Sequence, residues 1–355
     1  MKPRKPVVID LRKYDPEGGW YDRALPFYQI DSRLMPPFEW LVKKMIPKVG
    51  VGVLVGRWGK SKTYLALDLA RAVGTMTEYA GRKTQHCAVL YVGVDRPRQT
   101  SRRANFMMRH YGLKELPLFF IHECPPLKDG DALRTLSDTV HAINETSRVR
   151  VGLIIIDTLV VAAQWKDEGS SAEVQVALKT LRALSNDTNT FVLALDHTGK
   201  NEALGPRGSS DKQASTDILL TVHMADQCPT GHLEVTRSSD GPEGQRIEFE
   251  RVVHDIGKDD DGEVITECTI RWGDEITRDQ IARDAECDAV LTAISEGAGQ
   301  SLETIARHAN LQRNVVYRAT QRMPDLVRLQ KRVGWELTEA GRQRVIFLAN
   351  SGGET

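Results

Sequence analysis

One glycine-rich segment constrains this chain more than any other part of its sequence. Residues 56–63 read Gly-Arg-Trp-Gly-Lys-Ser-Lys-Thr and fit the phosphate-loop pattern G-x-x-x-x-G-K-[ST], except that Ser61 stands at the second glycine. In such a loop, backbone N–H groups surround a phosphate chain, the lysine reaches the β and γ phosphates, and the Ser or Thr hydroxyl holds Mg²⁺. The segment therefore predicts a chain that binds a nucleoside triphosphate.

The residues on either side of this loop support the same interpretation. The apolar, β-branched run 51–55 is typical of a buried parallel strand, and residues 64–73 are typical of a helix, so a helix N-terminus would face the anion. Two alternatives stay open: a register ending in Gly-Lys-Ser at 59–61, and an ordinary turn between a strand and a helix. We prefer the register ending in Lys-Thr at 62–63. The expected nucleotide contacts are Gly56, Arg57, Trp58, Gly59, Lys60, Ser61, Lys62, Thr63 and Tyr64.

Length and composition set limits on the rest of the chain. With 355 residues it is long enough for a full α/β core and a smaller module. Lys+Arg and Asp+Glu both number 48, a balance that neither indicates nor excludes a nucleic-acid partner. The five cysteines form no C-x-x-C pair, which suits a reducing cytosol, and neither a membrane-spanning run nor a secretory signal is visible. We expect a soluble, cytoplasmic protein without a membrane partner.

Hydrophobic patterning divides the chain into three parts, of which the middle one is the largest. Residues 1–35 have no clear period and are expected to form an N-terminal arm. Residues 36–275 alternate apolar strands with amphipathic stretches, which predicts an α/β fold with a mostly parallel sheet flanked by helices. The later strands have no helices between them and should form an antiparallel edge, with a charged turn or a hairpin tip at 257–262. Strands are expected at 51–55, 88–94, 118–121, 151–156, 190–195, 218–222, 232–236 and 247–253, and helices at 64–73, 98–110, 131–145 and 172–185.

The third part, residues 280–346, has the pattern of a small winged-helix module. Its expected elements are helices at 281–296, 302–309 and 315–323 and strands at 326–330 and 335–338. Ser301 fits the N-cap of the second helix. A basic third helix beside a wing is a geometry for docking on duplex DNA, although winged helices also serve protein contacts. The basic residues on or beside that helix are Arg313, Arg318 and Arg322.

Three strands of the middle part end in polar side chains that would complete a nucleotide site. Asp157 follows an apolar run, and a carboxylate there would hold Mg²⁺ through its water shell, next to Thr63. Asp95 ends the strand after the loop's helix, which we expect beside the loop's own strand, where it would polarise the attacking water. His197 ends another strand and would respond to the γ phosphate. Each residue also has an ordinary structural alternative, as a loop cap, a turn former or a hydrogen-bonded loop histidine.

The segment after His197 is a candidate for contact with a nucleic-acid backbone. Residues 201–212 are rich in glycine and polar residues, which is typical of a mobile loop, and a plain surface loop is the alternative interpretation. Basic side chains in or beside it would bind the phosphates of single-stranded DNA. These side chains are Lys200, Arg207 and Lys212.

The order of these parts resembles that of the RecA-like hexameric motor ATPases, and among them the RepA-type replicative helicases of plasmids and phages. The resemblance covers roughly residues 36–255. It is carried by Trp40-Leu41-Val42, Met45-Ile46-Pro47, His197-Thr198-Gly199-Lys200, Gly205-Pro206-Arg207-Gly208-Ser209-Ser210, Thr216-Asp217-Ile218, Leu233-Glu234-Val235-Thr236-Arg237 and Asp240-Gly241-Pro242-Glu243-Gly244. It implies a RecA-like core and a ring of six copies with ATP between subunits. The catalytic residues that it implies are Lys62, Asp95, His197 and, reaching into the neighbouring subunit's ATP, Arg237.

Four positions depart from that family's pattern. Ser61 replaces a glycine, Asp95 stands for the usual glutamate, Asp196 for a second histidine, and Ser239 for a second basic residue. Together these departures are compatible with a slow or specialised ATPase.

These observations lead to one preferred function and two alternatives. We expect a ring-forming ATPase that uses ATP and Mg²⁺ to move on single-stranded DNA in its channel, as a replicative helicase of a mobile element. The first alternative is an ATP-controlled DNA-binding regulator or recombination mediator without unwinding activity. The second is a structural P-loop protein that binds nucleotide without turnover, which Ser61 and Asp95 suggest.

Overall fold

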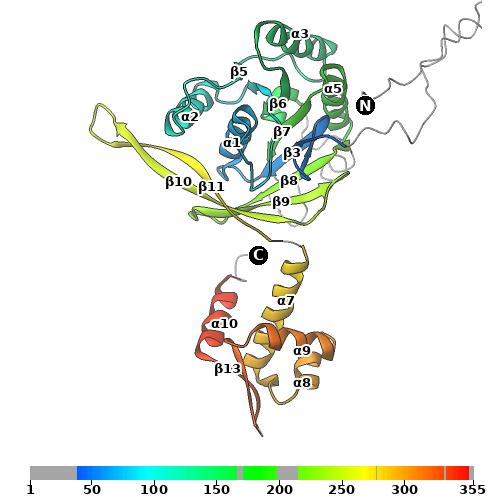
Figure 1. Cartoon of the computed structure of the whole chain (residues 1–355), viewed down its shortest axis with the longest axis vertical. Coiled ribbons are helices and arrows are strands. Elements are labelled where there is room, and N and C mark those ends of the chain that lie inside the picture. Colours follow the sequence, from blue (N-terminus) through cyan, green and yellow to red (C-terminus); the bar gives the residue numbers. More distant parts are fainter. Residues whose placement is uncertain (1–37, 166–170, 198–214, 277, 332, 352–355) are drawn as a thin grey trace, which may run out of the picture. The chain divides into compact units, whose positions relative to one another are not determined.

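The computed structural model describes residues 38–165, 171–197, 215–276, 278–331 and 333–351 (Figure 1). The predicted N-terminal arm and the 201–212 loop lie outside these ranges. Among the described residues, no helix is long and apolar enough to cross a bilayer. The α/β part contains β1 (Trp40–Val42), β2 (Ile46–Pro47), β3 (Gly50–Gly56), α1 (Lys62–Thr75), β4 (Ala88–Gly93), α2 (Pro97–His110), β5 (Leu118–Ile121), α3 (Gly130–Thr146), β6 (Val151–Asp157), α4 (Leu159–Ala163), α5 (Ser171–Thr188), β7 (Phe191–His197), β8 (Ile218–His223), β9 (Thr230–Ser238), β10 (Arg246–Lys258) and β11 (Val264–Ile276).

Nine of these strands form one sheet in the order β11-β10-β9-β8-β3-β7-β6-β4-β5. The strands from β8 to β5 in this order pair in parallel, and β9, β10 and β11 add an antiparallel edge. This confirms the predicted mostly parallel sheet with antiparallel edge strands. Successive side chains of β3 alternate between two cores, because a strand's side chains point to opposite faces in turn. Leu54 packs with α1 residues, whereas Val53 and Val55 pack with residues of α3 and α5.

One predicted neighbour relation is wrong. We expected the strand that leads to Asp95 to lie beside the phosphate-loop strand, but β3 lies between β7 and β8, and β4 lies between β6 and β5. The two later strands β6 and β7 occupy the intervening positions, and both are almost entirely buried. Sequence order and sheet order differ here because long crossover connections allow a strand to skip positions. All of these parallel strands still end at the same edge of the sheet.

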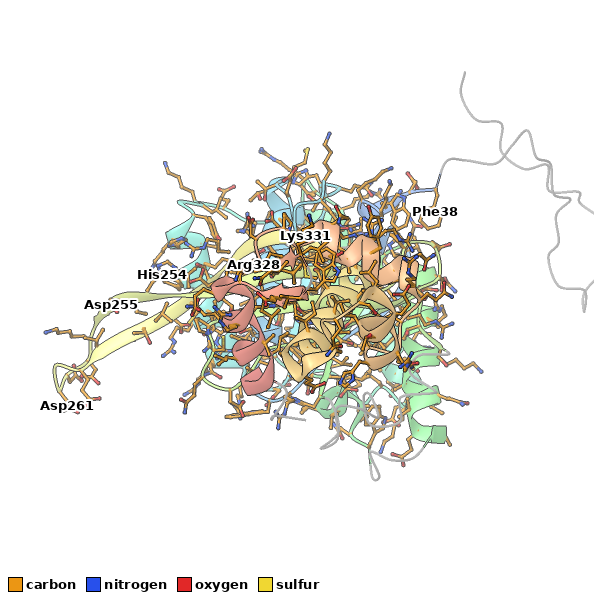
Figure 2. All side chains as sticks on the ribbon, turned by 90° about the horizontal axis from the view of Figure 1, so that it is seen from below. Phe38, His254, Asp255, Asp261, Arg328 and Lys331 are labelled. Carbon is orange, nitrogen blue, oxygen red and sulfur yellow. The ribbon has the colours of Figure 1, made fainter. Side chains whose placement is uncertain are left out.

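The antiparallel edge is longer than the sequence predicted. β10 and β11 pair along 13 residues each, and β11 was not predicted as a strand. β9 pairs with β10 only from Arg246 to Glu250, so the outer half of the hairpin consists of two strands (Figures 1 and 2). That outer half exposes the apolar side chains Val253, Ile256 and Val264. A half-buried strand is recognised by alternating apolar and polar residues. The outer half of this hairpin is exposed on both faces and lacks that alternation.

The C-terminal part has a hydrophobic core of its own. Its elements are α7 (Arg278–Ala293), the π-helical turn η5 (Ile294–Ala298), α8 (Leu302–His308), α9 (Arg313–Arg322), β12 (Val327–Gln330), β13 (Gly334–Leu337) and α10 (Glu339–Ser351). Ile305 of α8, Val316 of α9 and Val327 of β12 belong to its core cluster. Ser301 caps α8 as predicted, since its hydroxyl accepts a hydrogen bond from the backbone N–H of Thr304 at 3.1 Å. The sequence did not predict α10.

The packing of β3 between its neighbours makes Gly52 sensitive to substitution. A Cβ atom there would lie 2.5 Å from Cγ2 of Ile218 and 2.7 Å from Cζ of Phe191. We expect Gly52→Ala to lower the free energy of unfolding by about 1–3 kcal/mol, measured by urea denaturation, because overpacking forces strain on a buried site. Gly130→Ala is the matched control, since no atom lies within 4 Å of its added Cβ. Equal effects of the two substitutions would contradict this packing.

Candidate nucleotide-binding site

Seven of the nine predicted nucleotide contacts, all but Gly56 and Arg57, and three of the predicted partners line one cavity at the carboxyl edge of the parallel strands. The cavity has a volume of about 250 Å³. Its lining includes Asp95 after β4, Asp157 at the end of β6 and His197 at the end of β7. The loop and the start of α1 contribute Trp58, Gly59, Lys60, Ser61, Lys62, Thr63 and Tyr64. Residues far apart in the sequence therefore meet where the strands end.

The ammonium group of Lys62 is held over the loop by backbone oxygens. Its Nζ donates hydrogen bonds to the carbonyls of Gly56 at 2.7 Å and Arg57 at 2.9 Å, and it lies 3.1 Å from Nδ1 of His197. Burial lowers the pKa of Lys62 to about 8, and the carboxylates of Asp157 and Asp196 oppose this shift. A buried cation whose hydrogen bonds go to neutral backbone carbonyls is well placed to bind an anion.

Asp157 joins the end of β6 to the start of α1. Its Oδ2 accepts hydrogen bonds from the hydroxyl groups of Thr63 at 3.1 Å and Tyr91 at 2.7 Å. Burial raises the pKa of Asp157, and these two hydrogen bonds act in the opposite direction. A hydroxyl and a carboxylate side by side are hard oxygen donors of the kind that Mg²⁺ prefers, so the residues fit this ion.

The backbone at Ser61 explains why the phosphate-loop pattern has glycine there. Ser61 has φ 64° and ψ 8°, the left-handed conformation, immediately before α1 begins. A non-glycine residue in this conformation costs about 1–2 kcal/mol because its Cβ crowds the following carbonyl. The ammonium of the preceding Lys60 pairs with Asp226 in the loop after β8. This geometry agrees with the register ending in Lys62-Thr63 rather than with the one ending in Lys60-Ser61.

Asp95 is anchored to Asp157 through the backbone. Its N–H donates a hydrogen bond to the carbonyl of Asp157 at 3.1 Å, although their strands end in different loops. Its carboxylate is partly exposed and lies 3.9 Å from the guanidinium of Arg96. An exposed carboxylate beside the cavity can meet a water molecule there.

The helix α2 supplies site residues that the sequence analysis missed. Gln99 and Arg103 line the cavity, and the guanidinium of Arg103 lies 4.6 Å from the ring centroid of Tyr64. The hydroxyl of Tyr64 donates to the buried carboxylate of Glu267 on β11 at 3.1 Å. The available signal was the spacing of 99 and 103, which places both on one face of a helix that begins beside Asp95.

Other predicted residues are not part of this cavity. Arg237 of β9 pairs with Leu219, three residues before Val222, which pairs with Gly56 at the loop end of the sheet. Arg237 therefore lies about 10 Å back along the sheet from the phosphate loop. The candidates Lys200, Arg207 and Lys212 lie outside the described residues. The remaining candidates lie exposed on α9 and are Arg313, Arg318 and Arg322.

Comparisons with known proteins assign the family. The sequence model of the AAA domain designated AAA_25 matches residues 23–203, just over half of the chain. The protein belongs to this AAA domain family. It is accordingly a nucleotide-binding P-loop NTPase, in agreement with the resemblance seen in the sequence. The RadB recombinase is a similar solved structure, with 16% sequence identity, a TM-score of 0.39, and coverage of 57% of this chain and 87% of that chain. No curated protein sequence matches the chain significantly.

The strained loop conformation predicts that two substitutions at Ser61 differ in their effect on stability. Ser61→Gly removes the Cβ and should raise the free energy of unfolding by about 0.5–1 kcal/mol, whereas Ser61→Ala keeps the strain and should not stabilise. Thermal unfolding of the three proteins checks this order. If Ser61→Gly is no more stable than Ser61→Ala, the left-handed conformation at this residue is not a source of strain.

Proposed function

We propose that this protein is an ATP-driven motor that assembles into a ring, with six copies favoured, and acts on DNA as a replicative helicase of a mobile element. One observation carries the ATP-hydrolysing part. The Thr63 hydroxyl and the Asp157 carboxylate lie 3.1 Å apart beside the buried Lys62, in the cavity that Asp95 and His197 also line. This arrangement supports binding of a nucleoside triphosphate with its Mg²⁺. It also supports a role for Asp95 as the acid–base group beside the γ phosphate.

Each residue of the cavity has a role in this proposal. Lys62 exchanges the Gly56 and Arg57 carbonyls for phosphate oxygens, and the N–H groups at the start of α1 bind the same anion. The Thr63 hydroxyl would bind Mg²⁺, and the Asp157 carboxylate would hold the ion through its water shell. The ion would supply positive charge near the β and γ phosphates. Asp95 orients the attacking water.

His197 is the proposed reporter of the γ phosphate. Its Nδ1 lies 3.1 Å from the Lys62 ammonium, so a change in what Lys62 binds alters the hydrogen bonding of His197 directly. The 201–212 segment follows His197 in the chain, and we propose that it passes this change to single-stranded DNA through Lys200, Arg207 and Lys212.

Two features support assembly of several copies. A cavity of about 250 Å³ is smaller than the roughly 300–1,000 Å³ of typical small-molecule sites, which supports a nucleotide only partly enclosed by one chain. The outer half of the β10–β11 hairpin exposes Val253, Ile256 and Val264, and a two-stranded ribbon is marginally stable without a further partner. In the proposed ring, Arg237 would reach a neighbouring subunit's site, since it lies away from its own.

The C-terminal part supports contact with duplex DNA. We propose that it is a winged-helix module in which α8 and α9 form the helix–turn–helix and the β12–β13 hairpin forms the wing. Arg318 of α9 is exposed. Arg328 of β12 and Lys331 after it are exposed as well (Figure 2). Basic residues on a recognition helix and a wing match the way such modules meet DNA phosphates. This basic surface also favours the second candidate, an ATP-controlled DNA-binding regulator or recombination mediator.

Paired lysine variants test the ATPase and its register. Lys62→Ala should lower ATP hydrolysis stimulated by single-stranded DNA at least about 100-fold, because it removes a charge that the transition state needs. Lys60→Ala removes the side chain that pairs with Asp226 and, in the register ending in Lys62-Thr63, should lower the activity far less than Lys62→Ala does. The measurement is phosphate release with and without single-stranded DNA. Wild-type hydrolysis that single-stranded DNA does not change would contradict the motor.

Strand displacement on a forked duplex separates the two candidate functions. A helicase separates the strands in an ATP-dependent reaction that Lys62→Ala abolishes. A regulator or recombination mediator binds the same fork and leaves it intact. The mass of the particle formed with an ATP analogue and single-stranded DNA tests the ring, and a stable monomer would contradict it.

A further inference from the structure

Two histidines and a glutamate gather on β8 and β9. His223, the last residue of β8, pairs with His232 of β9 across the strands. Their rings are stacked, with centroids 4.6 Å apart and planes 18° apart. Nε2 of His223 lies 3.1 Å from Oε2 of Glu234. One nitrogen or oxygen atom from each of the three side chains lies within 4.8 Å of the other two.

The cluster lies on the side of the sheet that faces away from α1. Val222, Leu233 and Val235 belong to the hydrophobic core that α1 covers. Because strand side chains alternate between faces, the residues next to them, His223, His232 and Glu234, point to the other face. The side chain of His223 is 38% exposed and that of Glu234 is 19% exposed, so an ion in solution can reach them.

His232 carries an unsatisfied polar atom. Its Nε2 is buried and has no hydrogen-bond partner among the residues that the structure describes. Leaving such an atom buried without a partner costs about 1–3 kcal/mol. A neutral imidazole nitrogen without a partner, in a side chain beside a second imidazole and a carboxylate, has the chemistry of a metal ligand.

We propose that His223, His232 and Glu234 bind a divalent transition-metal ion of the Zn²⁺ class. Two imidazoles and one carboxylate are the ligand set of zinc centres that keep a fourth position for water. Bonds of about 2.0–2.2 Å in a tetrahedron place neighbouring ligand atoms about 3.3 Å apart. The contact between His223 and Glu234, at 3.1 Å, is close to this separation. A ligand atom of His232 lies within 4.8 Å of the other two, so the His232 ring has to turn out of its stack on His223 to bind the same ion.

The positive charge of Arg246 repels a cation bound at this cluster and limits the affinity that we expect for the metal ion. The Nε of Arg246 lies 3.5 Å from the same Glu234 oxygen. A carboxylate that binds a metal commonly accepts a hydrogen bond from a second residue as well. Arg246 can donate this hydrogen bond to Oε1 of Glu234 when Oε2 binds the ion. Its positive charge still repels the ion, so we expect micromolar rather than nanomolar affinity.

The position of the cluster connects it to the phosphate loop. A metal ion bound to His223 and His232 ties together the two ends of the 224–229 loop. In that loop, Asp226 pairs with Lys60, and Sδ of Met224 lies 3.6 Å from Oγ of Ser61. Metal binding would hold this loop against the phosphate loop and raise nucleotide affinity, a consequence that rests on the proposed function, whereas the metal site itself does not.

Titration of Zn²⁺ into the metal-free full-length protein, in competition with a chromophoric chelator, tests the site. We expect one ion per chain at this site, and His232→Ala or Glu234→Gln should weaken it at least about tenfold. Arg246→Gln should tighten it several-fold, which a purely structural role of the cluster would not produce. His254→Ala is the matched control, because His254 contacts His110 at 4.4 Å between ring centroids and belongs to no such ligand set within the part of the chain that the structure describes.

Two further readouts make the outcome decisive. Co²⁺ in place of Zn²⁺ should give the visible absorption of a four-coordinate site in the wild type, and this signal should be lost in Glu234→Gln. Absence of micromolar binding, or Zn²⁺ uptake that His232→Ala and Glu234→Gln leave unchanged while both variants remain folded, would overturn the site. Lys62→Ala should bind Zn²⁺ normally, so failure of the nucleotide site and failure of the metal site are distinguishable.

Discussion

The hydrogen bond from Thr63 to Asp157 is the contact on which the arrangement of the candidate site depends. It joins the first turn of α1 to the end of β6, across the end of the intervening strand β7. His197 ends β7, and its ring contacts Lys62. The adjacent strands β3, β7 and β6 thus end, in this order, at the loop that leads to Lys62 and Thr63, at His197 and at Asp157. The next strand, β4, is joined to this group because the Asp157 carbonyl accepts a hydrogen bond from the N–H of Asp95.

The same contacts allow the loop to hold a strained residue. Backbone strain persists only where the surroundings determine the conformation more strongly than the residue's own preference. Ser61 is followed at once by Lys62, which binds two loop carbonyls, and by Thr63, which binds Asp157. The departure from glycine therefore affects local stability, while the groups that would meet phosphate and Mg²⁺ remain in position.

The sequence predicted which side chains meet at this site better than it predicted which strands lie next to one another. Asp95, Asp157 and His197 each follow an apolar strand, and parallel strands bring their carboxyl ends to one edge, so their meeting could be predicted. The position of β4 could not, because local sequence does not specify how many strands a crossover skips. Tyr91 was missed because it lies inside an apolar strand, where an aromatic residue normally indicates only core packing. β11 was missed because its exposed outer half lacks the alternation of a half-buried strand.

The most direct test of the account is the effect of Mg²⁺ on ATP affinity, measured by equilibrium binding in the wild type and in Asp157→Asn. The substitution keeps the shape of the side chain and removes the charge that would favour the ion. We predict that Mg²⁺ tightens ATP binding at least about tenfold in the wild type and much less in Asp157→Asn, and that both proteins bind ATP equally well without metal. An equal Mg²⁺ effect in both proteins would contradict the assignment of Thr63 and Asp157 as the metal side of the site.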